Sequence, residues 1–191
     1  FFIVPADFLE ETGIAIKANE PGKLALLASE AASFPWKIPA HRIIGEALVN
    51  MEAYDYARDV WEKIKEKNPQ DKQTNINLAT IYQRLSEQEL PSNLLSAGLL
   101  LAKSDIAIDC LFDYHLTSDK DISAIYALKG RNLKSRWVNE VKGALPEKIS
   151  ETALQSTYLE QAYESYEKGY CENLNHFHCG INALGFLTML L

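Results

Sequence analysis

The sequence contains few of the residues that disulfide-bonded or β-rich proteins require. It has 3 Cys among 191 residues, and this small, odd number does not indicate a disulfide framework, so a reducing, cytoplasmic location is expected. Its 9 Gly and 7 Pro fall mainly at the ends of segments with helical periodicity. No segment combines strand-like alternation with an Asn-Gly or Asp-Gly turn. These absences favour an all-α fold.

Positive charge and long apolar runs are also scarce. There are 19 Lys and Arg against 26 Asp and Glu, a net charge of -7. An acidic chain gains no general attraction to phosphate backbones or anionic membranes, so no nucleic-acid partner is expected. The longest interior apolar run, LLSAGLLLA at 94–102, is shorter than the roughly 20 residues that span a bilayer. No membrane span is therefore expected.

The chain shows no set of residues suited to catalysis. It has no phosphate-binding loop, no kinase motif and no nucleophile with a base and an orienting group, so we expect it not to be an enzyme and to need no cofactor. Four residues near the C-terminus, Cys171, His176, His178 and Cys179, do not have the spacing of a structural zinc site. The sequence begins with Phe and stops inside an apolar helical pattern, FLTMLL, so we expect a longer protein around it.

One segment, AHRIIGEALVNMEAYDYARDVWEKIKEKNPQD at 40–71, has a regular order of small and large residues. In a 34-residue frame that starts at Ile38, Gly45 and Ala57 take positions 8 and 20, Trp61 takes position 24 and Pro69 position 32. Small residues allow two antiparallel helices to touch, a large residue fills the space between them, and the proline ends the second helix. This pattern resembles a tetratricopeptide repeat.

Two further units follow with longer spacings. Leu78, Ala79 and Tyr82 continue the frame, but their partner helix is expected only near Ala107 and Leu111. In a third unit, Gly130 takes position 8, and its partner helix supplies Ala162 and Tyr166 at positions 20 and 24. We therefore predict an insertion near 86–103 and a loop near 138–152.

Three motifs in the C-terminal half occur in a fixed order: ALKGRNLKSRW, AYESYEKGY and NHFHCGINAL. Their pattern resembles the TRAF-binding domain of apoptosis-signalling mitogen-activated protein kinase kinase kinases. Helical repeats precede this domain in bacterial proteins, and the repeats here match that arrangement. The resemblance implies an all-helical scaffolding or regulatory region.

The sequence thus predicts an α-solenoid of degenerate tetratricopeptide-like hairpins in three segments. An N-terminal helical pair at 1–36 caps the array, repeats occupy 37–117, and a TRAF-binding-domain-like region occupies 118–191. Stacked repeats leave a concave groove lined by the first helix of each pair, and such grooves bind a peptide or a helix. The expected partner is a protein or peptide, or another domain of the same polypeptide.

Positions not used for packing within a pair are expected to face the groove. The predicted partner-binding residues are Arg42, Glu46, Asn77, Gln83, Arg84, Arg131 and Lys134. Two alternatives stay open. One is a regulatory domain acting on an effector of the same chain, and the other is a small-molecule sensor with a pocket beneath the 94–102 segment.

Overall fold

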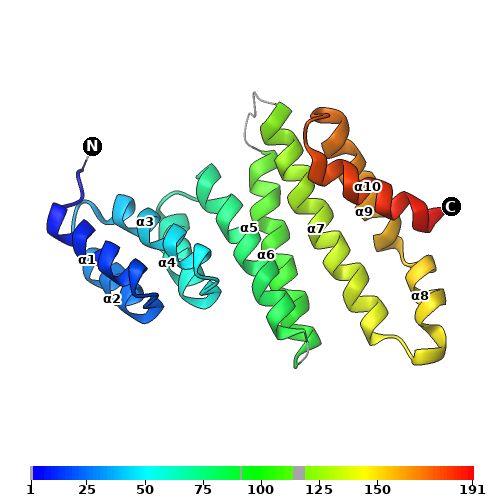
Figure 1. Cartoon of the computed structure of the whole chain (residues 1–191), viewed down its shortest axis with the longest axis horizontal. Coiled ribbons are helices and arrows are strands. Elements are labelled where there is room, and N and C mark those ends of the chain that lie inside the picture. Colours follow the sequence, from blue (N-terminus) through cyan, green and yellow to red (C-terminus); the bar gives the residue numbers. More distant parts are fainter. Residues whose placement is uncertain (1, 91, 114–118) are drawn as a thin grey trace. The chain divides into compact units, whose positions relative to one another are not determined.

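The computed structural model describes residues 2–90, 92–113 and 119–191, and this part of the chain is built from helices (Figure 1). The elements are α1 (Ala6–Lys17), α2 (Pro21–Ala31), α3 (Lys37–Asn50), α4 (Tyr54–Lys67), α5 (Lys72–Glu89), α6 (Leu94–Phe112), α7 (Asp119–Gly143), the 3-10 helix η1 (Pro146–Lys148), α8 (Ile149–Gln155), α9 (Thr157–Glu172) and α10 (Phe177–Leu190). The chain forms two compact units, Phe1–Tyr82 and Gln83–Leu191. The predicted all-α, helical-repeat fold is confirmed.

The N-terminal unit has a core between three successive helices. Leu24 and Leu27 of α2 and Ile44 and Leu48 of α3 are almost completely buried, and so is Ile64 of α4. Burial of each such side chain contributes about 1.5–3 kcal/mol. Because the apolar residues recur at helical spacing, each helix buries one face only.

Helices α3 and α4 form the hairpin that the 34-residue frame predicts. A Cβ atom built on Gly45 would lie 2.6 Å from Trp61 Nε1 and 2.8 Å from Trp61 Cε2, and the Trp61 side chain is fully buried. The two helices are joined by Glu52, which adopts a left-handed conformation with φ 58°. The N–H of Ala53 then donates to the carbonyl of Leu48 over 3.0 Å, a Schellman-type helix end. The predicted roles of Gly45 and Trp61 are confirmed.

His41 is a buried titratable group of this core. Its side chain is 3 % exposed, and Nε2 lies 2.8 Å from the carbonyl oxygen of Ala28. Because a carbonyl oxygen only accepts, Nε2 carries the proton of the neutral ring. Nδ1 is buried without a hydrogen-bond partner and carries no proton. Burial lowers the pKa of His41 below its ordinary value; the bond to Ala28 opposes this effect and the positive charges of Lys63 and Lys37 add to it.

Acidification is therefore expected to destabilise the protein through His41. Since the pKa is lowered in the folded state, the unfolded chain binds a proton first as the pH falls below 6.5. The free energy of unfolding should fall between pH 7 and 5.5, by at most about 1.4 kcal/mol per pH unit. Urea unfolding of wild type and of His41→Gln at pH 7 and 5.5 measures this change. If the free energy of unfolding fell equally with pH in the two proteins, the result would contradict the role of His41.

The C-terminal unit repeats the small-to-large packing between α7 and α9. A Cβ atom on Gly130 would lie 3.0 Å from the Tyr166 ring, and one on Gly169 would lie 2.8 Å from Cys179 Sγ of α10. The hydroxyl of Ser123 donates to the carbonyl of Gly169 over 2.6 Å. Figure 1 shows α7, α9 and α10 gathered at this end of the chain. The predicted pairing of Gly130 with Tyr166 is confirmed.

One segment differs from the predicted secondary structure. The 138–152 region, predicted as a loop, is mostly helical, because α7 runs on to Gly143 and η1 and α8 follow. Its mixed charge is that of a solvent-exposed helix face. Trp137 Nε1 donates to the carbonyl of Ala153 over 2.9 Å, which holds α8 against α7. In the 86–103 region, α6 starts at Leu94 as one continuous helix. Leu101 is buried, whereas Leu94, Leu95 and Leu99 are exposed.

Candidate functional site

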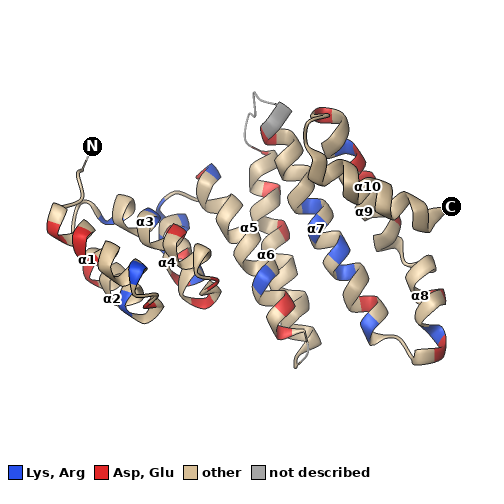
Figure 2. Cartoon of the chain, in the orientation of Figure 1, with Lys and Arg blue, Asp and Glu red and all other residues tan. Residues whose placement is uncertain are grey.

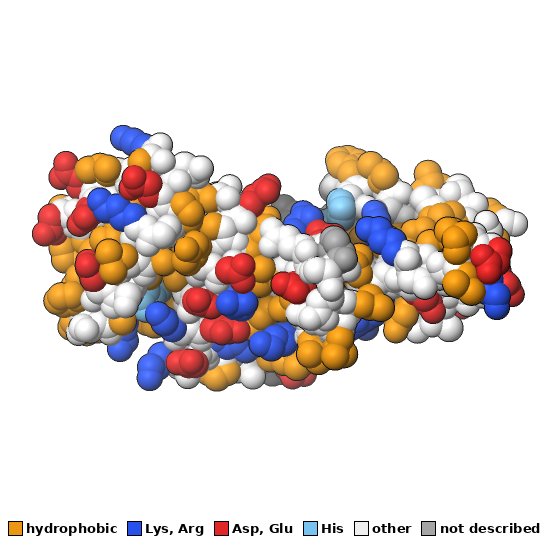
Figure 3. Space-filling model, turned by 90° about the horizontal axis from the view of Figure 1, so that it is seen from below, with side chains coloured by type: hydrophobic (Ala, Val, Ile, Leu, Met, Phe, Trp, Pro, Cys, Tyr) orange, Lys and Arg blue, Asp and Glu red, His pale blue; other side chains and the backbone are white. Residues whose placement is uncertain are grey.

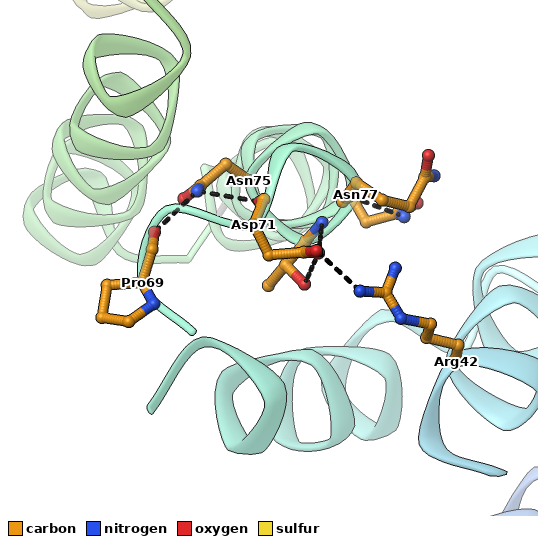
Figure 4. A network of polar contacts seen from close by, with 7 residues as sticks. Arg42, Pro69, Asp71, Asn75 and Asn77 are labelled. Carbon is orange, nitrogen blue, oxygen red and sulfur yellow. Dashed lines mark hydrogen bonds and ion pairs between the residues drawn. The ribbon is translucent and has the colours of Figure 1, made fainter. Parts of the chain in front are cut away.

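In the N-terminal unit, Arg42 takes part in a polar network at the start of α5 (Figure 4). Its guanidinium lies 2.6 Å from Asp71 Oδ1. Asp71 Oδ2 also accepts bonds from the backbone N–H and the hydroxyl of Thr74, at 2.8 and 2.5 Å. Asn75 donates to the carbonyl of Pro69 over 2.9 Å. Arg42 therefore ties α3 to the capping residue of α5.

Asp71 is expected to contribute both a helix cap and an ion pair. Burial alone would raise its pKa, but the bonds from Thr74 and Arg42 outweigh burial and lower it. Asp71→Ala should cost about 1–2 kcal/mol at pH 7, and Asp71→Asn less, since Asn still caps. Because the pKa is lowered, this stability is present above 3.8 and lost as the pH falls through the lower folded value. Chemical unfolding of wild type and Asp71→Ala at pH 7 and 3 checks this. If the two proteins differed in free energy of unfolding by the same amount at both pH values, the result would contradict the prediction.

Two other predicted residues of this unit lie at the surface. Glu46 on α3 is exposed, and Asn77 is half-buried on α5. Asn77 donates to the carbonyl of Gln73, one turn earlier on its own helix, over 3.0 Å. In Figure 4 the Asn77 side chain points away from Asp71. Neither of the two pockets described below has Arg42, Glu46 or Asn77 among its lining residues.

Gln83, at the start of the C-terminal unit, is completely buried. Its Nε2 donates to Glu87 Oε1 over 2.6 Å and to Ser135 Oγ over 3.0 Å. Its side chain therefore joins α5 to α7 inside the unit, rather than lying on the predicted partner-facing surface. Periodicity placed it on the groove side of α5, but in this unit α7 covers that side.

The remaining three predicted residues come together in a pocket of about 380 Å³, which we call the basic pocket. Helices α5, α7, α9 and α10 all supply its lining. The lining residues are Arg84, Glu87, Leu90, Arg131, Lys134, Ser135, Val138, Asn139, Lys142, Tyr166 and His178. Six of them recur along α7 at helical spacing, from Arg131 to Lys142, and so share one helix face. Figure 2 shows Lys and Arg recurring along this helix.

The charges of the basic pocket are mostly positive. Arg131, Lys134, Lys142 and Arg84 line it, and Glu87, the one carboxylate among its described lining residues, pairs with Arg84 at 3.0 Å. Burial lowers the pKa of His178, and the positive charges of His176, Lys134 and Arg131 lower it further. His178 is therefore neutral near pH 7.

Apolar and hydrogen-bonding groups complete the basic pocket. The Tyr166 ring contacts His178 edge-on, with centroids 5.8 Å apart. Lys134 Nζ donates to Asn182 Oδ1 over 3.3 Å, which orients the ammonium group toward α10. Ser135 Oγ accepts from Gln83 Nε2 over 3.0 Å. On the face seen in Figure 3, a histidine lies beside Lys or Arg side chains.

Sequence reasoning missed several residues of this pocket. Asn139 and Lys142 fall in the predicted loop, although Asn139 lies eight residues after Arg131 and Lys142 eight residues after Lys134, a little over two helical turns. That spacing was the available signal, and the Gly143 and Pro146 that follow obscured it. His178 and Tyr166 come from helices distant in sequence, so only the folded chain brings them to α7.

The Cys and His residues near the C-terminus have separate structural roles. Cys179 is buried, with Sγ 3.8 Å from the carbonyl of Ser123. His176 caps α10 by accepting from the Cys179 N–H over 3.3 Å. Cys171 is exposed. Within the described ranges no three His, Cys, Asp or Glu residues are grouped as metal ligands.

The helical hairpins and their small-to-large contacts define a protein of the tetratricopeptide-repeat class. The family model described as Tetratricopeptide Repeats-Sensor matches residues 53–190, and the chain belongs to this family. Comparisons with curated proteins and with solved structures gave no match. The match includes all the elements that line the basic pocket. Among the described helices, none has the length and hydropathy to cross a membrane.

Proposed function

We propose that this chain is a non-catalytic sensor module that recognises an anionic ligand in the basic pocket. The observation that carries the proposal is the gathering of Arg84, Arg131, Lys134 and Lys142 around one concavity, in a chain whose net charge is -7. In an acidic protein such a cluster is not a consequence of composition. It concentrates positive potential where a ligand can enter.

The size and lining of the basic pocket favour a ligand of limited size. Its volume of about 380 Å³ lies within the usual range of small-molecule sites. Leu90, Val138 and the Tyr166 ring supply apolar contact, while the cations and the Ser135 hydroxyl supply donors. This combination suits a compound with a charged group and an apolar body. Ligand binding would draw α5, α7, α9 and α10 together and so change the rigidity of the unit.

Recognition of an acidic peptide or helix is a second candidate, favoured by the length of the basic face. Arg131 and Lys142 are eleven residues apart on α7, about 16 Å along a helix axis. That distance matches two or three turns of an acidic helix. The peptide would come from a partner protein or from another domain of the same polypeptide, in keeping with the TRAF-binding-domain resemblance of residues 123–191. The sequence also predicts peptide binding, but in the groove of the stacked repeats, whereas this candidate assigns it to the basic pocket of the C-terminal unit.

A binding panel tests the proposal and separates its two forms. Isothermal titration calorimetry would measure phosphate, pyrophosphate, ATP, citrate and a poly-glutamate peptide on wild type and on Lys134→Ala. Lys148→Ala is the matched control, since Lys148 is exposed on η1 in the same unit and does not line the pocket. A compound bound by wild type and by the control, but weakened by Lys134→Ala, supports the proposal. Tighter binding of the peptide than of every small anion selects the second candidate.

Weak binding of the whole panel, unaffected by Lys134→Ala, would overturn both forms. In that case the positive side chains would serve only to balance the acidic surface of the chain. The experiment should be repeated at two ionic strengths, because Arg84, Lys134 and Lys142 are exposed and their attraction for an anion must weaken as salt rises. Binding that does not change with salt would also contradict recognition by charge.

A further inference from the structure

The N-terminal unit has a second concavity of opposite character, which we call the aromatic pocket. It has a volume of about 350 Å³ and lies where the start of α1 meets the end of α2 and the turn that follows. Its lining residues are Pro5, Asp7, Phe8, Glu11, Glu30, Phe34 and Trp36. All of them precede residue 53, so the family match does not include this pocket.

Three aromatic rings form one wall of the aromatic pocket. The Phe34 ring is stacked on Trp36 with centroids 4.8 Å apart and planes 7° apart, and Phe8 is tilted against Trp36 at 4.8 Å. Trp36 is held by packing against a small core of Val4, Ala31 and Ala40. Phe34, in contrast, is 48 % exposed. The core therefore fixes the Trp36 ring, whereas Phe34 presents its outer face to solvent.

The other side of the aromatic pocket is negatively charged. Asp7, Glu11 and Glu30 are exposed, and the described lining residues include no Lys, Arg or His. Lys23 pairs with Glu11 at 3.3 Å, and Asp7 Oδ1 accepts the N–H of Phe8 over 2.9 Å at the start of α1. Three carboxylates with one paired lysine leave a net negative charge beside the rings.

We propose that the aromatic pocket binds an organic cation that carries an alkylated ammonium group. The face of an aromatic ring attracts a cation through its quadrupole, and alkyl groups on nitrogen add apolar contact while they spread the charge. Carboxylates near the rings strengthen the attraction and repel anions. An apolar ligand would gain nothing from the carboxylates, and a strongly hydrated metal ion would gain little from the rings. The inference does not depend on the proposed function of the basic pocket.

A titration followed by heteronuclear NMR tests this assignment on the full chain. Choline chloride is the probe, and its neutral isostere 3,3-dimethyl-1-butanol, at matched ionic strength, is the comparison. We expect saturable shifts of the amides near Phe34 and Glu30 with choline, and binding of the isostere weaker by about fivefold or more. A second arm uses a peptide with a trimethylated lysine. If that peptide binds more tightly than choline, the cation recognised is a side chain of another protein. If the two bind equally, only the ammonium group is recognised.

Two variants separate the contributions of charge and ring. Glu30→Gln removes one carboxylate, and Phe34→Leu removes the exposed ring while it keeps apolar volume. Each should weaken choline binding by about threefold to tenfold. Glu10→Gln is the matched control, because Glu10 is exposed on α1 and does not line the pocket. Absence of saturable shifts up to about 100 mM choline, equal binding of the neutral isostere, or equal effects of Glu30→Gln and Glu10→Gln would overturn the proposal.

Discussion

Replacement of Trp61 by alanine is expected to destabilise the N-terminal unit by about 3–5 kcal/mol, the range for large-to-small changes of a buried aromatic residue. Trp61 is fully buried, and its ring fills the space that Gly45 leaves between α3 and α4. Few side chains can move into that space, because the surrounding residues are already packed. Urea unfolding followed by circular dichroism at 222 nm measures the loss.

The contact between Trp61 and Gly45 predicts strong coupling of their substitutions. Gly45→Ala in the wild type should cost about 1–3 kcal/mol, because its Cβ would overlap the indole ring. In the Trp61→Ala background the same change should be neutral or stabilising, since Ala favours helix over Gly by about 1 kcal/mol. Gly13→Ala is the control, because a Cβ there meets nothing within 4 Å. Additive effects of the two substitutions would show that the contact does not determine the packing.

Reversal of charge at Lys134 should abolish most ligand binding in the basic pocket without a comparable loss of stability. Lys134 is exposed, so Lys134→Glu should change the free energy of unfolding by less than about 0.5 kcal/mol. Charged hydrogen bonds contribute about 1.5–3 kcal/mol, so the dissociation constant of an anion that binds wild type should rise about 10- to 100-fold. Calorimetry with the best anion of the panel measures this. Lys148→Glu is the matched control.

His178 provides an independent readout of the same event. Its pKa is lowered by burial and by neighbouring cations that include Lys134. A bound anion neutralises those cations and should raise the pKa of His178, so binding takes up protons in the pH range over which His178 titrates. Lys134→Glu should raise the pKa even without ligand. A histidine Cε1–H titration by NMR, with and without ligand, checks both expectations, and an unchanged His178 titration on saturation would place the ligand elsewhere.

The repeat pattern was readable because it depends on local spacing and residue size. Gly45, Trp61, Gly130 and Tyr166 could be paired from sequence, since position 8 of a first helix must face position 24 of its partner whatever the rest of the chain does. The same reasoning failed for 138–152. There Gly143 and Pro146 indicated a loop, but they only divide one helix from the next, and helical continuity up to Gly143 depends on packing against neighbouring helices.

The candidate site was predicted less completely than the fold. Arg84, Arg131 and Lys134 line the basic pocket, but Gln83, which precedes Arg84 and is also a predicted partner-binding residue, is completely buried. Arg42 has its charge engaged by Asp71, which lies twenty-nine residues further along the chain. A helix face can be read from periodicity, but the partner that covers it cannot.

The sequence by itself determined the all-α class, the α3–α4 and α7–α9 pairings and the acidic balance, because these follow from composition and from the local order of small and large residues. Only the tertiary structure decided which cations converge. Lys142, Tyr166 and His178 join Arg131 because α7, α9 and α10 pack through the glycine contacts at 130 and 169, and helix ends far apart in sequence meet there. Likewise, the rings and carboxylates of the aromatic pocket come from two helices and a turn. Such convergence depends on how helices cross, a property of side-chain packing that no local pattern encodes.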